Sequence, residues 1–538
     1  MSDAPPGYTS VPCGSLDLAN NENKLRRKLA TVTVTFLFGH RFDLVRLQDA
    51  YYELLRAWPF LAARLRKGRK HPELWRLQVP DRETVEGLIA FDQAGAFTKS
   101  RPPMFSCLDS SNEDIETVMP IIGLAKHVKA EPPKTPVTCD VDRKVLLKYG
   151  THPYTAKSNN DYFTRDANIL PVHVNNFRNG AAWSLTFPHV CFDAAGIKVV
   201  LTAYTNLLRG DTVAALPPLG YDPFAQLKPS NAKHGAVDDS TAVSQKQSAP
   251  PAPSPWSIVS LAGLLVLAFY FAFDLLWDRP DRQMRRVAFY LPPAAIAELK
   301  AQARADLERE IGGRASDVRI STGNVITAWI IKNDLVRRSQ VAPNRSVVLA
   351  TLADMRFARP NGVKEIAPNY LSNCLIPIPT DPRPASELNE MSLGSLALML
   401  RQAIDRTRNP AELEKFVRWQ VWRSTPIEEG GGHRAGEMAF FFPPSAYFTI
   451  VTDWSAFKLY DFDFSPAFEN GGSDDGASKD ILNILTDAHV AVHHRNAWTV
   501  AGGRDGGTWV IGYISNTERR HPAGWGRYAD AESVLKSS

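Results

Sequence analysis

The chain has few of the residues that build metal centres, disulfide frameworks or phosphate-binding loops. Its 538 residues include only 5 cysteines, widely scattered, and no two of them have the spacing of metal ligands. Their odd number also argues against a disulfide framework. The glycine-rich stretches 430–432 and 470–476 are not followed by the Lys-Ser or Lys-Thr of a phosphate loop. We therefore expect no metal site and no nucleotide hydrolysis.

A strong excess of charge of one sign is missing as well. The chain has 62 Lys and Arg against 57 Asp and Glu, so its net charge is only +5, and the basic residues are spread out. This distribution argues against nucleic acid as a partner. Residues 1–23 are polar and lack the apolar centre of a secretory signal peptide. We expect the protein to work in a reducing compartment, facing the cytosol.

The apolar content, in contrast, is that of a globular protein. Hydrophobic residues make up 44% and aromatic residues 10% of the chain, which at this length is enough for two sizeable cores. Strand and helix signals are mixed without strict alternation, which favours an α/β or mixed α+β fold in two domains. Within the first half, residues 98–161 contain Pro132, Pro133 and Pro136 and are predicted to be largely irregular.

The most informative stretch is His189-Val190-Cys191-Phe192-Asp193. Two predicted strands, 170–177 and 182–187, precede it, and a predicted helix over 197–208 follows it. His189 therefore lies where a strand gives way to a helix. An imidazole at such a position can face a cleft and take a proton from a hydroxyl or an amine. The spacing alone is weak, because most histidines beside apolar strands are packed or solvated.

Further landmarks along the chain strengthen this interpretation. They comprise Phe42–Leu47, Trp58–Leu65, Ser321-Thr322, Asp354-Met355-Arg356, Pro368–Asn373, Thr452-Asp453-Trp454 and Tyr460–Ser465. Together with the H-x-x-x-D motif, they resemble in order and spacing the BAHD family of acyl-CoA-dependent acyltransferases, and the pattern is that of a fungal-type member. One element is eroded, because Ser465-Pro466-Ala467 stands where the family has Gly-Trp-Gly. Only Asp463 and Phe464 of that structural element remain.

The resemblance implies a fold and an activity. The fold would consist of two chloramphenicol-acetyltransferase-like domains with a channel between them that reaches His189 from two sides. The protein would transfer an acyl group from acyl-CoA to a small, lipophilic alcohol or amine. Acyl-CoA would be a co-substrate, with no permanently bound cofactor, and the protein would be a monomer.

The resemblance also implies roles for individual residues. His189 would be the general base, while Thr452 and Trp454 would lie near the oxyanion, where a hydroxyl and an indole N–H can donate hydrogen bonds. Asp193 would orient the loop of His189 by pairing with Arg356. Cys191 lies inside the motif, but nothing beside it is arranged to lower its pKa, so no thiol nucleophile is expected.

One segment does not fit a protein that works in water alone. From Trp256 to Phe273, eighteen residues carry no charge, and the apolar run continues to Trp277. By length this segment is a transmembrane helix candidate, and Trp256 and Trp277 would suit the two interfaces. The arginines at 279, 282, 285 and 286 would favour an anionic cytosolic membrane face.

The predicted domain organisation limits how this segment can meet a membrane. We expect an N-terminal domain over 1–225, a linker with the apolar segment over 226–284, and a C-terminal domain over 285–538. The family's active site uses both domains, so a single crossing would separate its halves. We therefore expect membrane association through a re-entrant or interfacial segment, with a helix packed on the protein as the alternative.

Two other functions stay open at this point. A condensation-type catalyst would use a carrier-protein thioester, although such relatives usually have a second histidine where this chain has Pro188. A non-catalytic descendant would use the channel only for binding, which the eroded Gly-Trp-Gly makes conceivable.

Overall fold

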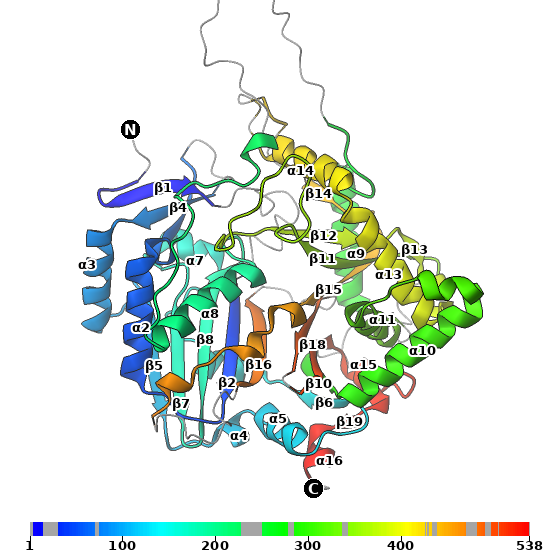
Figure 1. Ribbon diagram of the computed structural model, residues 1–538, viewed down its shortest axis with the longest axis horizontal. Helices are drawn as coiled ribbons and strands as arrows, with labels where there is room; N and C mark the ends of the chain where they lie inside the picture. The colour runs from blue at the N-terminus through cyan, green and yellow to red at the C-terminus, as the bar shows by residue number, and fades with distance from the viewer. Residues whose placement is uncertain are drawn as a thin grey trace, which may run out of the picture.

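A computed structural model of the chain shows two mixed α/β lobes, each built around one sheet (Figure 1). It describes residues 4–13, 31–69, 75–227, 250–277, 284–335, 343–425, 427, 430–432, 438–469, 481–489, 497–503 and 505–536. The predicted fold class is confirmed.

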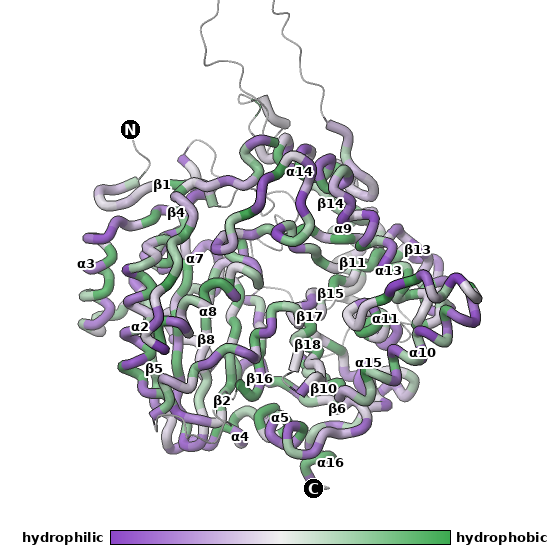
Figure 2. The backbone as a smooth tube through the Cα atoms, in the orientation of Figure 1, coloured by the Kyte–Doolittle hydropathy of each residue, from purple (hydrophilic) through white to green (hydrophobic). Residues whose placement is uncertain are grey.

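The first lobe holds a five-stranded sheet in the order β16-β2-β8-β7-β5. Its strands are β2 (Thr31–Phe38), β5 (Phe105–Ser110), β7 (Val172–Phe177), β8 (Gly180–Pro188) and β16 (Ile481–His489). Helices α2 (Leu44–Ala57), α3 (Arg82–Gln93) and α8 (Ala194–Leu208) lie beside this sheet (Figure 1). Hydrophilic and hydrophobic residues alternate along α2 and α3 (Figure 2), as expected for helices with one face on a core.

The second lobe holds a larger sheet in the order β12-β11-β15-β17-β18-β10-β6-β19, with β13 paired to β11. Its strands are β6 (Val137–Asp140), β10 (Arg285–Leu291), β11 (Ser346–Asp354), β12 (Leu375–Pro379), β13 (Arg383–Pro384), β15 (Tyr447–Asp453), β17 (Ala497–Gly502), β18 (Thr508–Ile514) and β19 (Ala529–Asp530). Its helices include α10 (Pro293–Ile311), α11 (Thr322–Leu335), α12 (Ala385–Glu390), α13 (Leu393–Thr407) and α14 (Pro410–Ser424).

Smaller elements complete the described chain. A three-stranded sheet joins β1 (Tyr8–Pro12), β3 (Arg64–Lys67) and β4 (Trp75–Pro80). Short helices are α4 (Ile115–Val118), α5 (Ile121–Ala130), α6 (Arg143–Gly150), α7 (Asn159–Thr164), α15 (Asn516–Arg520) and α16 (Ala531–Lys536). The prediction that 98–161 is largely irregular is wrong, because β5, α4, α5, β6 and α6 lie within it.

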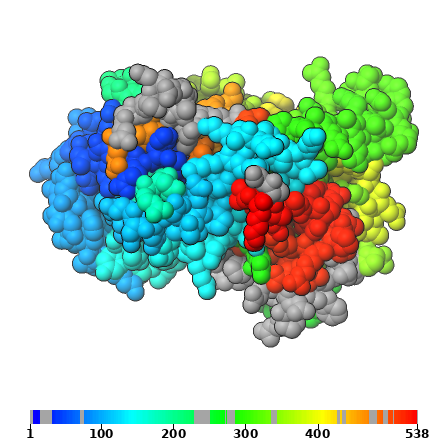
Figure 3. All heavy atoms as spheres, turned by 90° about the horizontal axis from the view of Figure 1, so that it is seen from below, coloured from blue at the N-terminus to red at the C-terminus, as the bar shows by residue number. Residues whose placement is uncertain are grey.

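The two halves of the chain exchange strands between the lobes. Strand β6, from the first half, pairs with β10 and β19 in the second sheet. In return, β16 from the second half pairs with β2 along the full length of β2. Figure 3 shows the C-terminal residues in red lying against cyan residues of the first half. Each sheet therefore contains chain from both halves, which argues against lobes on opposite sides of a bilayer; the exact domain boundaries stay a prediction.

The apolar run that begins at Trp256 is not one continuous helix. Residues Ser257–Val259 form strand β9, which pairs with β14 (Met438–Phe440), and helix α9 begins only at Leu261 and ends at Trp277. Among the described residues, no helix combines the length and apolarity needed to cross a bilayer. The length of the run from Trp256 made it a transmembrane candidate, and the described residues do not bear out that candidate. Hydropathy along the chain could not reveal that β14, about 180 residues later, would pair with the start of the run.

The predicted interfacial role of Trp256 is wrong as well. Its side chain is only 7% exposed and packs among the rings of Phe416, Trp419 and Phe441. The side chain of Trp277 lies outside the described residues. An aromatic cluster in the second lobe therefore accounts for Trp256.

Of the predicted basic cluster after α9, the structure describes only Arg285 and Arg286. Arg285 pairs with Asp140 at 3.0 Å. Arg286 is buried, donates to the carbonyl oxygen of Thr486 and lies 3.9 Å from Asp487. Arg279 and Arg282 lie outside the described residues. Arg285 therefore joins β10 to β6 within the second sheet, and Arg286 joins β10 to β16 of the first sheet. The sequence could not show these partners.

Candidate active site

The H-x-x-x-D stretch forms the turn between β8 and α8. Strand β8 ends at Pro188, and the N–H of Cys191 donates to the Pro188 carbonyl oxygen at 2.9 Å. Asp193 caps α8, because its Oδ1 accepts a hydrogen bond from the Gly196 N–H at 2.8 Å. His189 is half-buried at the start of this turn. The predicted strand-to-helix position of His189 is confirmed.

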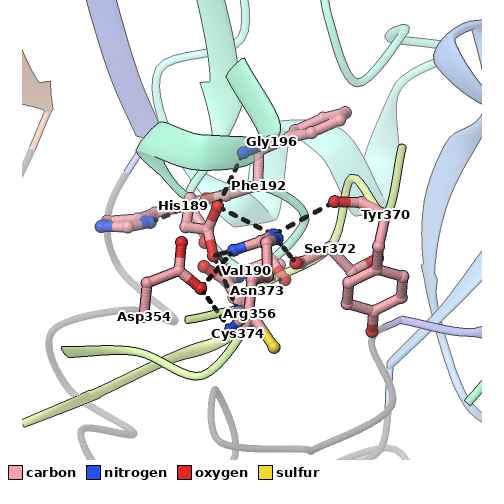
Figure 4. Close-up of polar contacts among 11 residues, drawn as sticks. His189, Val190, Phe192, Gly196, Asp354, Arg356, Tyr370, Ser372, Asn373 and Cys374 are labelled. Atoms are coloured by element: carbon pink, nitrogen blue, oxygen red, sulfur yellow. Dashed lines mark hydrogen bonds and ion pairs between the residues drawn. The ribbon is translucent and has the colours of Figure 1, made fainter. Parts of the chain in front are cut away.

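One ring nitrogen of His189 is held by its own loop. Nδ1 lies 3.1 Å from the carbonyl oxygen of Phe192. A carbonyl oxygen only accepts, so this contact favours the tautomer with the proton on Nδ1. Nε2 is then the basic nitrogen. In Figure 4, the ring points away from the cluster around Arg356.

The carboxylate of Asp193 belongs to the cluster around Arg356. Arg356 contacts it with two nitrogens, Nη1 to Oδ2 at 3.1 Å and Nη2 to Oδ1 at 3.2 Å. The Cys374 N–H also donates to Oδ2, at 2.7 Å. Asp193 is only 1% exposed. The predicted pairing with Arg356 is confirmed, and the carboxylate is occupied by partners other than the imidazole.

Arg356 stays charged although it is buried. Burial alone would lower the pKa of Arg356, but the carboxylates of Asp193 and Asp354 raise it above its ordinary value. Its Nη2 also donates to the carbonyl oxygens of Tyr370 and Ser372, at 3.1 and 2.9 Å. This side chain from the second lobe therefore joins the loop of His189 to the segment 370–374 (Figure 4).

Asn373 makes a second connection to the same loop. Its Nδ2 donates to the carbonyl oxygens of His189 and Val190, each at 2.8 Å. The sequence marked Asn373 only as part of a landmark and did not reveal this contact. The nearby Gly196 explains how close the segments lie, because a Cβ there would be 2.0 Å from the Leu371 carbonyl oxygen.

Thr452 and Trp454 lie at the end of β15, beside the other lobe. The Trp454 Nε1–H donates to Thr452 Oγ1 at 3.0 Å, and both side chains are half-buried. The 3₁₀ turn Ser455–Phe457 that follows contacts α8, the helix that begins after the His189 loop. Because the indole N–H is used by Thr452, the Thr452 hydroxyl is the better placed donor for a substrate. The oxyanion role of either residue stays a prediction.

The contacts of Asp463 and Phe464 explain the structural role predicted for these two residues. Phe464 is 1% exposed and packs against the rings of Phe36, Trp183 and Tyr204 in the first lobe. Asp463 accepts hydrogen bonds from the Ser465 N–H and hydroxyl, at 3.0 and 2.6 Å. Phe464 thus anchors the second half in the first core, although the Gly-Trp-Gly is absent.

Cys191 is arranged as a packing residue. It is 1% exposed, and burial raises the pKa of its thiol well above the ordinary value. Its Sγ lies 3.6 Å from the buried Cys13 Sγ. A thiol with a raised pKa is a poor nucleophile at neutral pH, which agrees with the expectation of no thiol nucleophile.

A cavity of about 530 Å³ lies close to this site without including His189. Trp58, Phe60, Leu216, Tyr370 and Leu371 contribute to its walls. Tyr370, Leu371 and Ser372, three of its lining residues, belong to the segment that Arg356 joins to the His189 loop.

The comparisons with known proteins agree with this architecture. No family model matches the chain. The chain is 25% identical over 537 residues to the acetyltransferase MAT1 of Pseudozyma antarctica, which covers 97% of this chain and 98% of the relative. It is 26% identical over 560 residues to the acetyltransferase MATC1 of Mycosarcoma maydis, covering 98% of each. Among solved structures, TRI101 of F. graminearum in complex with coenzyme A and deoxynivalenol matches with a TM-score of 0.61 at 14% identity, over 97% of this chain and 99% of the other.

Fold and site together define a two-lobed transferase with a histidine at the junction of the lobes. The chain is similar over nearly its whole length to these fungal acetyltransferases, and it has the BAHD type of two-lobed fold that its landmarks predicted. It is an enzyme of that class.

Proposed function

We propose that this enzyme transfers an acetyl group from acetyl-CoA to a hydroxyl group of a small, lipophilic acceptor in fungal secondary metabolism. The observation that carries the proposal is the fixed His189, whose Nδ1 faces the Phe192 carbonyl oxygen at 3.1 Å while Asp193 is committed to Arg356. This arrangement supports a base that acts through Nε2 without help from the carboxylate. The names of the two fungal relatives support acetyl as the transferred group.

The reaction proceeds in one transfer without an acyl-enzyme. Nε2 of His189 takes the proton of the acceptor hydroxyl as its oxygen attacks the thioester carbon. The tetrahedral oxyanion then forms, and a hydrogen bond from the Thr452 hydroxyl stabilises it. When the carbon–sulfur bond breaks, the leaving CoA thiolate takes the proton from the imidazolium. The products are the acetyl ester and free CoA, and His189 is neutral again.

The acceptor is proposed as an alcohol, with an amine as the alternative nucleophile. Both nucleophiles carry a proton that His189 must take as they attack the thioester. The solved relative in complex with coenzyme A and deoxynivalenol binds a donor fragment and a small molecule at once. This supports a CoA thioester and a small acceptor as the two substrates. The reaction would take place in a compartment that faces the cytosol.

An end-point assay tests the proposal. The purified chain is incubated with labelled acetyl-CoA and a panel of hydroxylated terpenoids, and acetylated products are identified by mass spectrometry. We expect at least one acetate ester, absent with His189→Ala and present with the matched control His127→Ala. Products that form equally with His189→Ala, or acetylation that requires a carrier-protein thioester, would contradict the proposal.

A further inference from the structure

Helix α9 exposes a face that is apolar at every position. Leu261, Leu265, Val266, Phe269 and Phe273, with the alanines between them, are exposed, and we call them the α9 face. Leu261 is 75%, Leu265 65% and Phe269 64% exposed. No charged residue occurs from Trp256 to Phe273. Contiguous apolar surface of this kind marks a docking site.

The opposite face of α9 is packed on the second lobe. A Cβ at Gly263 would lie 3.4 Å from Pro444 Cγ, so the start of the helix lies against the segment that precedes β15. Leu264 and Leu267 pack against the second-lobe core, and the Arg345 guanidinium lies 4.8 Å above the Tyr270 ring. The helix therefore lies along the protein surface and presents one side outward.

The width of the α9 face indicates whether a lipid surface or a partner helix would cover it. At 100° per residue, the exposed positions from 261 to 273 cover an arc of about 160°. A partner helix in a coiled coil contacts mainly a two-in-seven stripe, and protein interfaces carry a polar rim. Here the whole arc lacks polar side chains. The hydrocarbon region of a bilayer can cover such an arc, because it needs no polar rim around the apolar contact.

The adjoining chain cannot supply an apolar cover. Residues 228–249, before α9, contain no Leu, Ile, Met or aromatic residue, and 278–283, after it, read Asp-Arg-Pro-Asp-Arg-Gln. The second segment has two acidic and two basic residues, so its charges cancel. Arg285 and Arg286 are engaged with Asp140 and Asp487. Segment 278–283 therefore adds no net charge, and the two described arginines after it are paired with carboxylates.

We propose that the α9 face inserts in the plane of one leaflet of a phospholipid bilayer and holds the enzyme there. Insertion depends on apolar contact, so zwitterionic phosphatidylcholine suffices and salt has little effect. The helix lies parallel to the surface, because its other side is packed on the lobe. A lipophilic acceptor dissolved in the same leaflet would then be concentrated close to the enzyme. The inference concerns attachment and stands independently of the transfer reaction.

Flotation of the full chain with phosphatidylcholine vesicles tests the proposal. The wild type is expected to float with the vesicles, in 0.1 M and in 0.5 M NaCl. The double variant Leu265→Glu/Phe269→Glu is expected to lose about tenfold or more in partitioning, because two charges enter the face. The matched control Val45→Glu/Leu108→Glu places the same charges on exposed apolar residues elsewhere and should float like the wild type. Circular dichroism of all variants shows whether they are folded.

Depth measurements distinguish lying on the membrane from entering it end-on. Nitroxide labels are attached at Ala262→Cys and Ala272→Cys in a Cys107→Ser background, since Cys107 is exposed. Oxygen accessibility should report similar depths for both labels, whereas a graded depth would overturn the in-plane orientation. Wild type that stays in the lipid-free fraction would overturn the proposal. So would a lipid-free dimer that the double variant converts to a monomer, because the face would then join two copies.

Discussion

At the scale of single residues, the two functional side chains of the H-x-x-x-D stretch are separated by their partners. His189 is bound by its own loop through Phe192, while Asp193 is bound by Arg356, Gly196 and Cys374. The imidazole and the carboxylate therefore act independently. In the proposed mechanism the imidazole serves the chemistry, while the carboxylate holds the loop.

Replacing Asp193 by Ala should destabilise the protein. The change removes one of the two carboxylates that pair with the buried Arg356 and also removes the cap of α8, which together cost about 3 to 5 kcal/mol in the free energy of unfolding. Urea denaturation measures this loss. The matched control is Asp211→Ala, which removes an exposed ion pair with Arg209 and should cost less than about 1 kcal/mol. A soluble Asp193→Ala protein of unchanged stability and no activity would instead assign the carboxylate a chemical role.

Replacing Asn373 by Ala should reduce turnover more than substrate binding. Two carbonyl oxygens of the His189 loop lose their donor, so the imidazole is less well positioned. We expect kcat to fall about tenfold while KM for acetyl-CoA changes less than about twofold. Steady-state kinetics beside the neighbouring Ser372→Ala control measure the difference. Equal kcat in the two variants would show that the Asn373 contacts do not position the base.

At the scale of secondary structure, strand β16 carries a buried histidine into the first sheet. His489 Nε2 lies 2.8 Å from Thr33 Oγ1, and Thr33 Oγ1 lies 2.9 Å from Thr186 Oγ1. Burial lowers the pKa of His489 from 6.5 to about 4. The folded protein therefore keeps this imidazole neutral at pH values where the unfolded chain has already protonated it.

Acid should weaken the attachment of β16 in a defined range of pH. Between pH 6.5 and about 4 the unfolded state binds more protons, so the free energy of unfolding decreases as the pH falls. The full contribution of this histidine is about 3 kcal/mol. Denaturant unfolding at pH 7 and pH 5 should show a smaller loss for His489→Gln than for the wild type. An identical loss in both proteins would assign the acid sensitivity to other groups.

Helices and strands could be predicted where the pattern that specifies them lies within the segment itself. The helix expected over 197–208 is α8, and the strand expected over 182–187 is β8, because their apolar periodicity and turn residues lie within each segment. Region 98–161 was misjudged from its prolines. Pro132, Pro133 and Pro136 all fall between α5 and β6, so they mark one loop and leave the neighbouring elements intact.

At the scale of the whole molecule, the lobes are joined by exchanged strands and by Phe464. Strand β16 pairs with β2 across more than 440 positions of chain, and β6 pairs with β10 across about 150. No local pattern could have predicted these pairings, because each depends on which sheet edge, formed by residues far away in the sequence, is left unpaired. The His189–Arg356 region could be predicted only because the landmark spacing resembles a known family.

Because of this exchange, the two lobes should unfold together. Each lobe loses a strand of its sheet when the other unfolds, so neither is complete alone. Scanning calorimetry should show one transition, with equal calorimetric and van't Hoff enthalpies. Fragments 1–225 and 285–538 expressed separately should not fold. Two resolved transitions, or folded fragments, would contradict the account of the exchanged strands.

The central claim is that His189, held at the junction of the two lobes, removes the acceptor proton in a direct transfer. Rapid-quench measurement of a single turnover tests it most directly, once an acceptor has been found, with wild type and His189→Ala compared at saturating acetyl-CoA. The account predicts a rate about a thousandfold lower for the variant, unchanged folding, and no acetylated protein in either reaction. A rate within tenfold of the wild type, or acetyl-enzyme that forms and decays during turnover, would contradict it.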